Sequence, residues 1–194
     1  MKTITTNLIV LLMPALFLFV GCSNSTDPAP TSGSISGSVT FTGTWPTTGT
    51  VSISLNTGWP PTGAPYAFKT IESTNLDLDN KYSYSFENVA FGTYPAIAIS
   101  WQDPDDSNHA TNQHTLGAYG GVYPFVSTYG GTDPTAVTVS NILYELTTIN
   151  IDADLKYVDA CQKQITQGAC EALDHCMWYP AESMGPSQTS DGCY

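Results

Sequence analysis

A run of oxygen-bearing side chains in one loop could bind a metal ion. Asp103, Asp105, Asp106 and Asn108 occur directly after an apolar stretch that ends at Trp101. Carboxylate and amide oxygens are the ligands that calcium prefers. The loop lacks the central glycine and the final glutamate of common calcium loops, so a solvated acidic turn begun by an Asp-Pro pair is the alternative. We expect no required cofactor here and keep calcium as the candidate metal.

Two tryptophans stand in loops that proline stiffens. Trp45 precedes a proline, and Trp59 precedes two. Rigid exposed rings stack on the apolar faces of sugars, so both residues are candidate ligand-binding side chains. The alternative is that the rings cover the open ends of the fold, and for Trp101, in its apolar stretch, we expect a core position. Trp59 is the better binding candidate, because its neighbours in the sequence are poorly suited to bury it.

No arrangement of residues indicates catalysis. The chain contains three histidines, and none accompanies a serine or cysteine in a recognisable nucleophile motif. His109 and His114 lie in the acidic loop and could hold a transition metal, although exposed loop histidines are commoner. We therefore predict no catalytic residues and a protein that is not an enzyme.

The cysteines at the C-terminal end predict disulfides. Cys161, Cys170, Cys176 and Cys193 all fall in the last 34 residues. An even number of cysteines in an exported chain is typical of a disulfide framework, here two bonds with three connectivities left open. A zinc site would place its ligands in closer pairs. We expect residues 156–194 to form a small disulfide-stapled segment.

The first 21 residues have the features of an export signal. Lys2 supplies a positive charge, an apolar run covers residues 8–20, and Gly21 precedes Cys22. The run is shorter than the ~20 residues that a membrane-spanning helix needs. Residues 19–22 resemble the lipobox of bacterial lipoproteins. That resemblance implies cleavage before Cys22 and attachment of diacylglycerol and acyl chains (palmitate among them) to this cysteine.

The composition of the rest of the chain agrees with an exported, membrane-anchored protein. Residues 22–33 are rich in Pro, Ser and Thr, a composition that predicts a flexible tether. The chain carries 17 acidic and 5 basic residues, for a formal net charge of −12. Such a charge repels phosphates, so we expect no nucleic-acid partner and no attraction to anionic headgroups. The cell envelope, and its outer membrane in particular, is the expected location.

The elements that must position these side chains are strands. Apolar residues alternate with polar ones at 35–41, 51–55, 82–86 and 149–153, which is the period of a half-buried strand. The segment 93–101 is apolar on both faces and should be a central strand. Turn sequences separate these segments, and no helical repeat precedes residue 156. We predict an all-β protein: an antiparallel Greek-key β-sandwich of about seven strands over residues 34–155.

Two glycines take part in a resemblance to a known family. Gly37 lies in the opening strand 35–43, and Gly92 lies in the segment 82–94, whose pattern is Tyr-x-Tyr-x-Phe-x-Asn-Val-x-x-Gly-x-Tyr. With the strand 51–55, these segments resemble the carboxypeptidase regulatory-like domains of the transthyretin-like group. The resemblance implies a β-sandwich that serves as a stalk or binding module, without catalytic residues. We expect Gly37 to allow close strand packing and Gly92 to permit a turn.

Two classes of function fit these observations. In the first, a non-catalytic, lipid-anchored envelope protein presents its sandwich to a glycan or protein ligand outside the cell or in the periplasm. In the second, the chain is a structural spacer or an accessory subunit of an envelope assembly or surface fibre, whose sheet edges pair with other chains. Trp45 and Trp59 exposed at one end would favour the first class. A long unprotected edge strand would favour the second.

Overall fold

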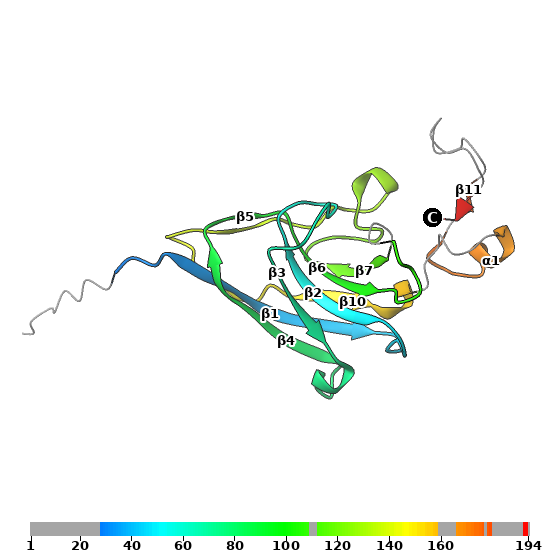
Figure 1. The fold of residues 1–194 in the computed structure, drawn as a ribbon, viewed down its shortest axis with the longest axis horizontal. Coiled ribbons are helices and arrows are strands. Elements are labelled where there is room, and N and C mark those ends of the chain that lie inside the picture. Colours follow the sequence, from blue (N-terminus) through cyan, green and yellow to red (C-terminus); the bar gives the residue numbers. More distant parts are fainter. Residues whose placement is uncertain (1–27, 109–111, 159–165, 177, 180–191, 194) are drawn as a thin grey trace, which may run out of the picture.

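The computed structural model describes residues 28–108, 112–158, 166–176, 178–179 and 192–193. Two sheets stack to form an all-β sandwich (Figure 1). The first sheet has the order β10-β1-β4, with β9 also paired to β1, and the second has the order β3-β2-β6-β7. The strands are β1 (Ser32–Thr42), β2 (Thr50–Asn56), β3 (Ala67–Ile71), β4 (Lys81–Ala90), β6 (Ala96–Gln102), β7 (Gln113–Ala118), β9 (Glu145–Leu146) and β10 (Ile151–Asp154).

Shorter elements connect and extend these sheets. A two-stranded ribbon joins β5 (Gly92–Tyr94) to β8 (Val137–Val139), and a second joins β11 (Trp178–Tyr179) to β12 (Gly192–Cys193). Among the described residues, the helical elements are three 3-10 turns, η1 (Ser73–Asn75), η2 (Ser127–Tyr129) and η3 (Leu155–Val158), and one short α-helix, α1 (Gln167–Glu171). Within the described residues, no helix has the length and apolar character needed to cross a membrane.

The predicted β-sandwich is confirmed, with one difference in strand direction. Most pairs are antiparallel, including β1 with β4 and β2 with both β3 and β6. By contrast, β10 and β9 pair with β1 in parallel. A parallel neighbour needs a long connection. Here the chain passes through the second sheet before it returns beside β1, and the sequence pattern does not show the direction of that return.

The core lies between the two sheets and follows the predicted alternation. Ile35 and Val39 of β1 and Ile53 and Leu55 of β2 are fully buried, whereas their sequence neighbours in β1 and β2 are mostly part-exposed. Four successive residues from Ala96 are buried, as expected of a central strand, and β6 does lie between β2 and β7. The predicted strand 93–101 is divided into β5 and β6 at Pro95, which has no backbone N–H to donate.

Gly37 and Gly92 have different roles. Gly37 pairs with Tyr84 across β1 and β4, and a Cβ at Gly37 would collide with the carbonyl group of Ile149. This close approach confirms the expectation for Gly37. The expectation for Gly92 is wrong: its φ is not positive, and no atom lies within 4 Å of the position that a Cβ would take. Gly92 begins β5, and a side chain there would be tolerated.

The C-terminal segment is stapled as predicted. A disulfide of 2.08 Å joins Cys170 of α1 to Cys193 of β12. Cys176 is also disulfide-bonded, and its partner lies outside the described residues, as do Cys161 and Cys22. The side chain of Thr166 caps α1 by accepting a hydrogen bond from the N–H of Ala169 at 3.3 Å. Figure 1 places α1 and β11 at the end of the sandwich opposite to the start of β1.

Candidate ligand-binding site

A shallow depression of about 300 Å³ lies between the long β7–β8 connection and the end of β10. Its walls are mostly apolar, with carboxylates from β10 among them. The lining residues are Thr42, Leu116, Gly121, Val122, Tyr123, Phe125, Asp152, Ala153, Asp154 and Tyr157. Because Thr42 ends β1, the depression lies at the end of β1 away from its start at Ser32.

Stacked aromatic rings form one wall of the depression. The rings of Tyr123 and Tyr157 stack face to face, with centroids 4.0 Å apart and an interplanar angle of 11°. Phe125 meets the ring of Tyr157 edge-on at 6.2 Å, and His175 of the C-terminal segment meets the same ring edge-on at 5.2 Å. The tail therefore packs against the sandwich through the side chains that line the depression.

Trp59 packs against this aromatic wall. Its indole N–H donates a 2.7 Å hydrogen bond to the carbonyl oxygen of Phe125, and its ring packs with Ala98 and Ala118. The backbone of Phe125 has φ 65°, a left-handed conformation that costs energy for a bulky residue and needs support from its surroundings. Trp59 is half-buried, and its hydrogen bond to Phe125 holds the β7–β8 connection in place.

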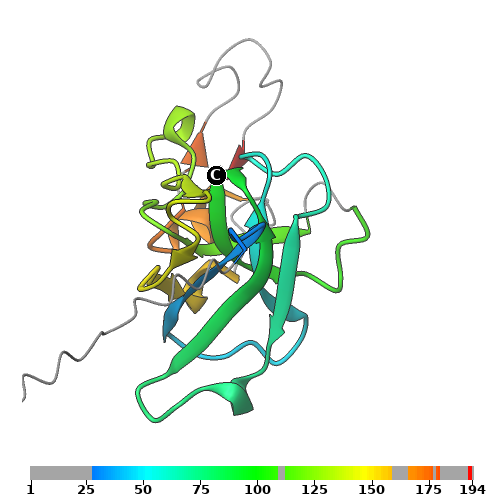
Figure 2. The same ribbon diagram turned by 90° about the vertical axis from the view of Figure 1, so that its left-hand side faces the viewer.

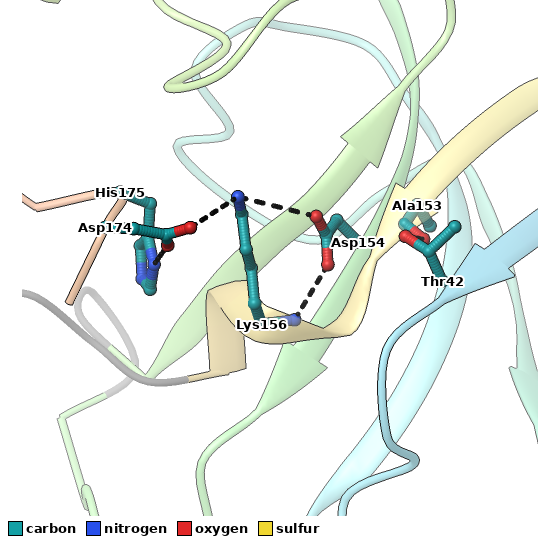
Figure 3. Close-up of polar contacts among 6 residues, drawn as sticks. All are labelled: Thr42, Ala153, Asp154, Lys156, Asp174 and His175. Atoms are coloured by element: carbon teal, nitrogen blue, oxygen red, sulfur yellow. Dashed lines mark hydrogen bonds and ion pairs between the residues drawn. The ribbon is translucent and has the colours of Figure 1, made fainter.

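Ion pairs close the side of the site nearest the tail (Figure 3). Lys156 Nζ lies 3.7 Å from Asp154 Oδ2 and 3.7 Å from Asp174 Oδ2. The backbone N–H of Lys156 also donates to Asp154 Oδ1 at 3.1 Å. The ammonium group is therefore engaged by two carboxylates, one from β10 and one from the C-terminal segment, so Lys156 offers little net positive charge to a ligand.

The phenols of the site are neutral at physiological pH. Burial raises the pKa of Tyr123, and the proximity of Tyr157 adds to the effect. Burial likewise raises the pKa of Tyr157. Asp152 is exposed on the rim. The depression thus combines apolar ring surface, neutral hydroxyls and carboxylate acceptors, which suits hydrogen bonding to the hydroxyl groups of a neutral ligand.

Trp45 lies at the other end of β2 from Trp59. Trp45 belongs to the β1–β2 connection, where its half-buried ring meets Phe41 edge-on with centroids 5.2 Å apart. Trp59 belongs to the β2–β3 connection. The two indoles therefore do not form one shared platform. Trp101 is buried in the core, as predicted, with its N–H donating to the carbonyl oxygen of Thr48 at 2.7 Å.

The acidic loop after β6 uses much of its oxygen capacity to order its own backbone. Asp103 Oδ1 accepts the N–H of Asp105 at 2.9 Å, and Asp106 Oδ1 accepts the N–H of Asn108 at 2.8 Å. These contacts are turn-forming bonds of the Asx type. Asp103 is buried, with its Oδ2 4.0 Å from Nε2 of His114. Over the described parts of the chain, no three His, Cys, Asp or Glu residues come together in a way that could hold a metal ion.

The sequence pattern did not single out the carboxyl end of β10. Tyr123 and Phe125 belong to an aromatic-rich segment, but their contacts with Tyr157 join positions that are far apart in the chain. The signal in the sequence is Tyr157, which follows the last predicted strand by four positions and comes just after Asp154 and Lys156.

Comparison with family models, with curated proteins and with solved structures found no match to this chain. The fold and the stapled tail therefore define the class of the protein: an all-β sandwich with a small disulfide-bonded C-terminal segment.

Proposed function

We propose that the protein is a non-catalytic, lipid-anchored protein of the cell envelope that presents its sandwich to an extracellular or periplasmic ligand. The lipobox-like residues before Cys22 support the anchor. The observation that carries the binding role is the depression lined by Tyr123, Tyr157 and the carboxylates of β10. It lies at the end of β1 away from the tether, where a ligand would approach from the side opposite the membrane.

The chemistry of the depression favours a neutral glycan as the ligand. Apolar ring surface packs against the apolar faces of sugars, and carboxylates accept hydrogen bonds from sugar hydroxyls. An acidic polysaccharide would meet Asp152 and Asp154 in a protein whose formal net charge is −12. Trp59 takes part as the support of Phe125, and Trp45, which lies at the other end of β2, is not assigned to this site.

Affinity electrophoresis tests the binding role. A soluble form that begins at Thr31 is run through native gels containing neutral polysaccharides such as glucans, xylans and mannans, or acidic ones such as alginate. We expect retardation by a neutral polysaccharide and its loss in Tyr157→Ala. Phe68→Ala is the matched control, because Phe68 is an exposed aromatic residue on β3 outside the depression. Retardation that survives Tyr157→Ala in a folded variant would contradict the assignment.

A structural role in an envelope assembly is the second candidate. It is favoured by β4, a ten-residue strand that pairs with β1 along one edge and, among the described strands, with none along the other. A free edge can accept a strand from another chain. An extra residue in β4, opposite Ser34, and the left-handed Asn88 (φ 55°) interrupt one end of this edge. Concentration-dependent assembly in sedimentation velocity, lost in Ser83→Lys, would favour this role over glycan binding.

A further inference from the structure

Three consecutive apolar side chains are exposed in the turn between β8 and β9. Ile142 is 88% exposed, Leu143 55% and Tyr144 39%. The turn is held in a defined shape by Ser140, whose N–H donates to the carbonyl oxygen of Leu143 at 2.9 Å and whose hydroxyl accepts the N–H of Leu143 at 3.0 Å. The exposed side chains are therefore presented by an ordered turn, and they form a larger apolar projection than a scattered surface residue would.

This turn lies directly beside the point where the chain enters the sandwich. The N–H of Ser34 donates to the carbonyl oxygen of Tyr144 at 2.7 Å. On the other side of β1, Ser32 pairs with Ala90, which precedes the exposed Phe91. The start of β1, the β4–β5 turn and the turn at 140–144 gather at one end of the molecule (Figure 1), which faces the viewer in Figure 2.

The length of chain between this end and Cys22 limits its distance from the membrane. Ten positions separate Cys22 from Ser32. A fully extended chain of that length spans at most about 35 Å. With lipid on Cys22, the start of β1 and the neighbouring turn at 140–144 are held within reach of the bilayer.

We propose that this end is a membrane-contact surface, formed by Ile142, Leu143, Tyr144 and Phe91, that rests in the interface of the bilayer holding the lipid anchor. The proposal rests on the lipid anchor of the proposed function. Aliphatic side chains next to a tyrosine suit the boundary between headgroups and acyl chains. The tyrosine ring has an apolar body that contacts acyl chains and a hydroxyl that stays hydrated. Glu145 and Glu87 lie near this surface and would be repelled by anionic headgroups. The bilayer that suits this surface is therefore zwitterionic. The contact would orient the sandwich with its aromatic depression facing away from the membrane.

The experiment uses the full lipidated chain in vesicles of phosphatidylcholine whose acyl chains carry bromine, a collisional quencher of tryptophan. Ile142→Trp places a reporter on the proposed surface. Leu78→Trp is the matched control, because Leu78 is fully exposed and lies at the opposite end of the sheet. It comes just before β4, whose first residue, Lys81, pairs with Thr40 near the end of β1. The wild-type chain supplies the background of the native tryptophans. Flotation of wild type and of Cys22→Ser with the same vesicles reports the anchor independently.

We expect the added fluorescence of Ile142→Trp to fall by roughly half and to shift to shorter wavelength, with Leu78→Trp unchanged. Equal quenching of the two reporters, or none in either, in chains that still float with the vesicles would overturn the contact surface and leave the anchor standing. Failure of the wild-type chain to float would overturn the anchor and, with it, this inference.

Discussion

The indole N–H of Trp59 donates a 2.7 Å hydrogen bond to the carbonyl oxygen of Phe125, which lies 66 positions further along the chain. This bond joins the β2–β3 connection to the β7–β8 connection at the wall of the depression. It links a residue singled out from sequence as a ligand-binding candidate to the residues that line the site.

Replacing Trp59 should weaken both stability and ligand binding. Trp59→Ala removes a half-buried ring and the bond to Phe125, and we expect a loss of about 2 kcal/mol in the free energy of unfolding. Trp59→Phe keeps a ring and should lose about 1 kcal/mol. Urea denaturation measures both values, provided that the free energy of unfolding has the same slope against urea concentration in each variant. Tyr129→Ala, an exposed ring on η2, is the control and should change stability little. A Trp59→Ala midpoint equal to that of wild type would contradict the supporting role.

The two glycines of the family-like pattern should respond in opposite ways. Gly37→Ala places a Cβ against the carbonyl group of Ile149, and we expect a loss of about 3 kcal/mol or failure to fold. Gly92→Ala meets no atom within 4 Å and should be neutral or slightly stabilising. Thermal and urea denaturation of the two variants measure the difference. Equal effects would show that Gly37 is not the site of close packing.

Stability should fall at alkaline pH because of buried tyrosines. Burial raises the pKa of Tyr94 to about 12, helped by its hydrogen bond to Tyr66, and burial also raises the pKa of Tyr84. The unfolded chain loses these phenol protons from about pH 10, where the folded protein still holds them. The folded state therefore binds more protons, and the free energy of unfolding decreases as pH rises from about 10 to about 12.

Tyr84→Phe separates this effect from other alkaline changes. The Tyr84 hydroxyl donates to the carbonyl oxygen of Ile149 at 2.7 Å, so the variant should lose about 1 kcal/mol at neutral pH. Its decline above pH ~10 should be shallower than that of wild type, because one shifted phenol is missing. Urea midpoints across this range test the prediction. A decline as steep as that of wild type would assign the alkaline loss to other groups.

The acidic loop should retain its structure without calcium. Asp103 and Asp106 each accept a hydrogen bond from a backbone N–H within the loop, so the turn is ordered by the chain itself. We expect the melting temperature to change by less than the ~2 °C that small stability effects produce when calcium or a chelator is added. A clear rise with calcium that Asp105→Asn abolishes would instead establish the loop as a calcium site.

The sequence predicted those parts of the fold in which one strand face is apolar. The alternation in β1, β2 and β10 correctly indicates which side chains are buried. The edge strand β3 was missed, because Phe68, Lys69 and Thr70 are all exposed and leave no period of two. The strand β7 was missed as well, because its last three residues, Leu116, Gly117 and Ala118, are all buried and show no alternation.

The candidate site was predicted only in part. The sequence indicates Trp59 as a candidate, but the site depends on stacking between Tyr123 and Tyr157, which come from separate segments. Local patterns carry no information on such pairs. The neighbours of Trp59 in the sequence are poorly suited to bury it, yet its indole N–H bonds to the distant carbonyl oxygen of Phe125, so Trp59 supports the site and does not line it.

Mass spectrometry of the protein produced from the full chain in a bacterial host tests the proposed lipid anchor at Cys22. We predict a mature N-terminus at Cys22 that carries diacylglycerol and an acyl chain, found in the membrane fraction, and an unlipidated product from Cys22→Ser. A wild-type protein whose Cys22 carries no lipid, or whose first 21 residues remain attached, would contradict the proposed lipid anchor.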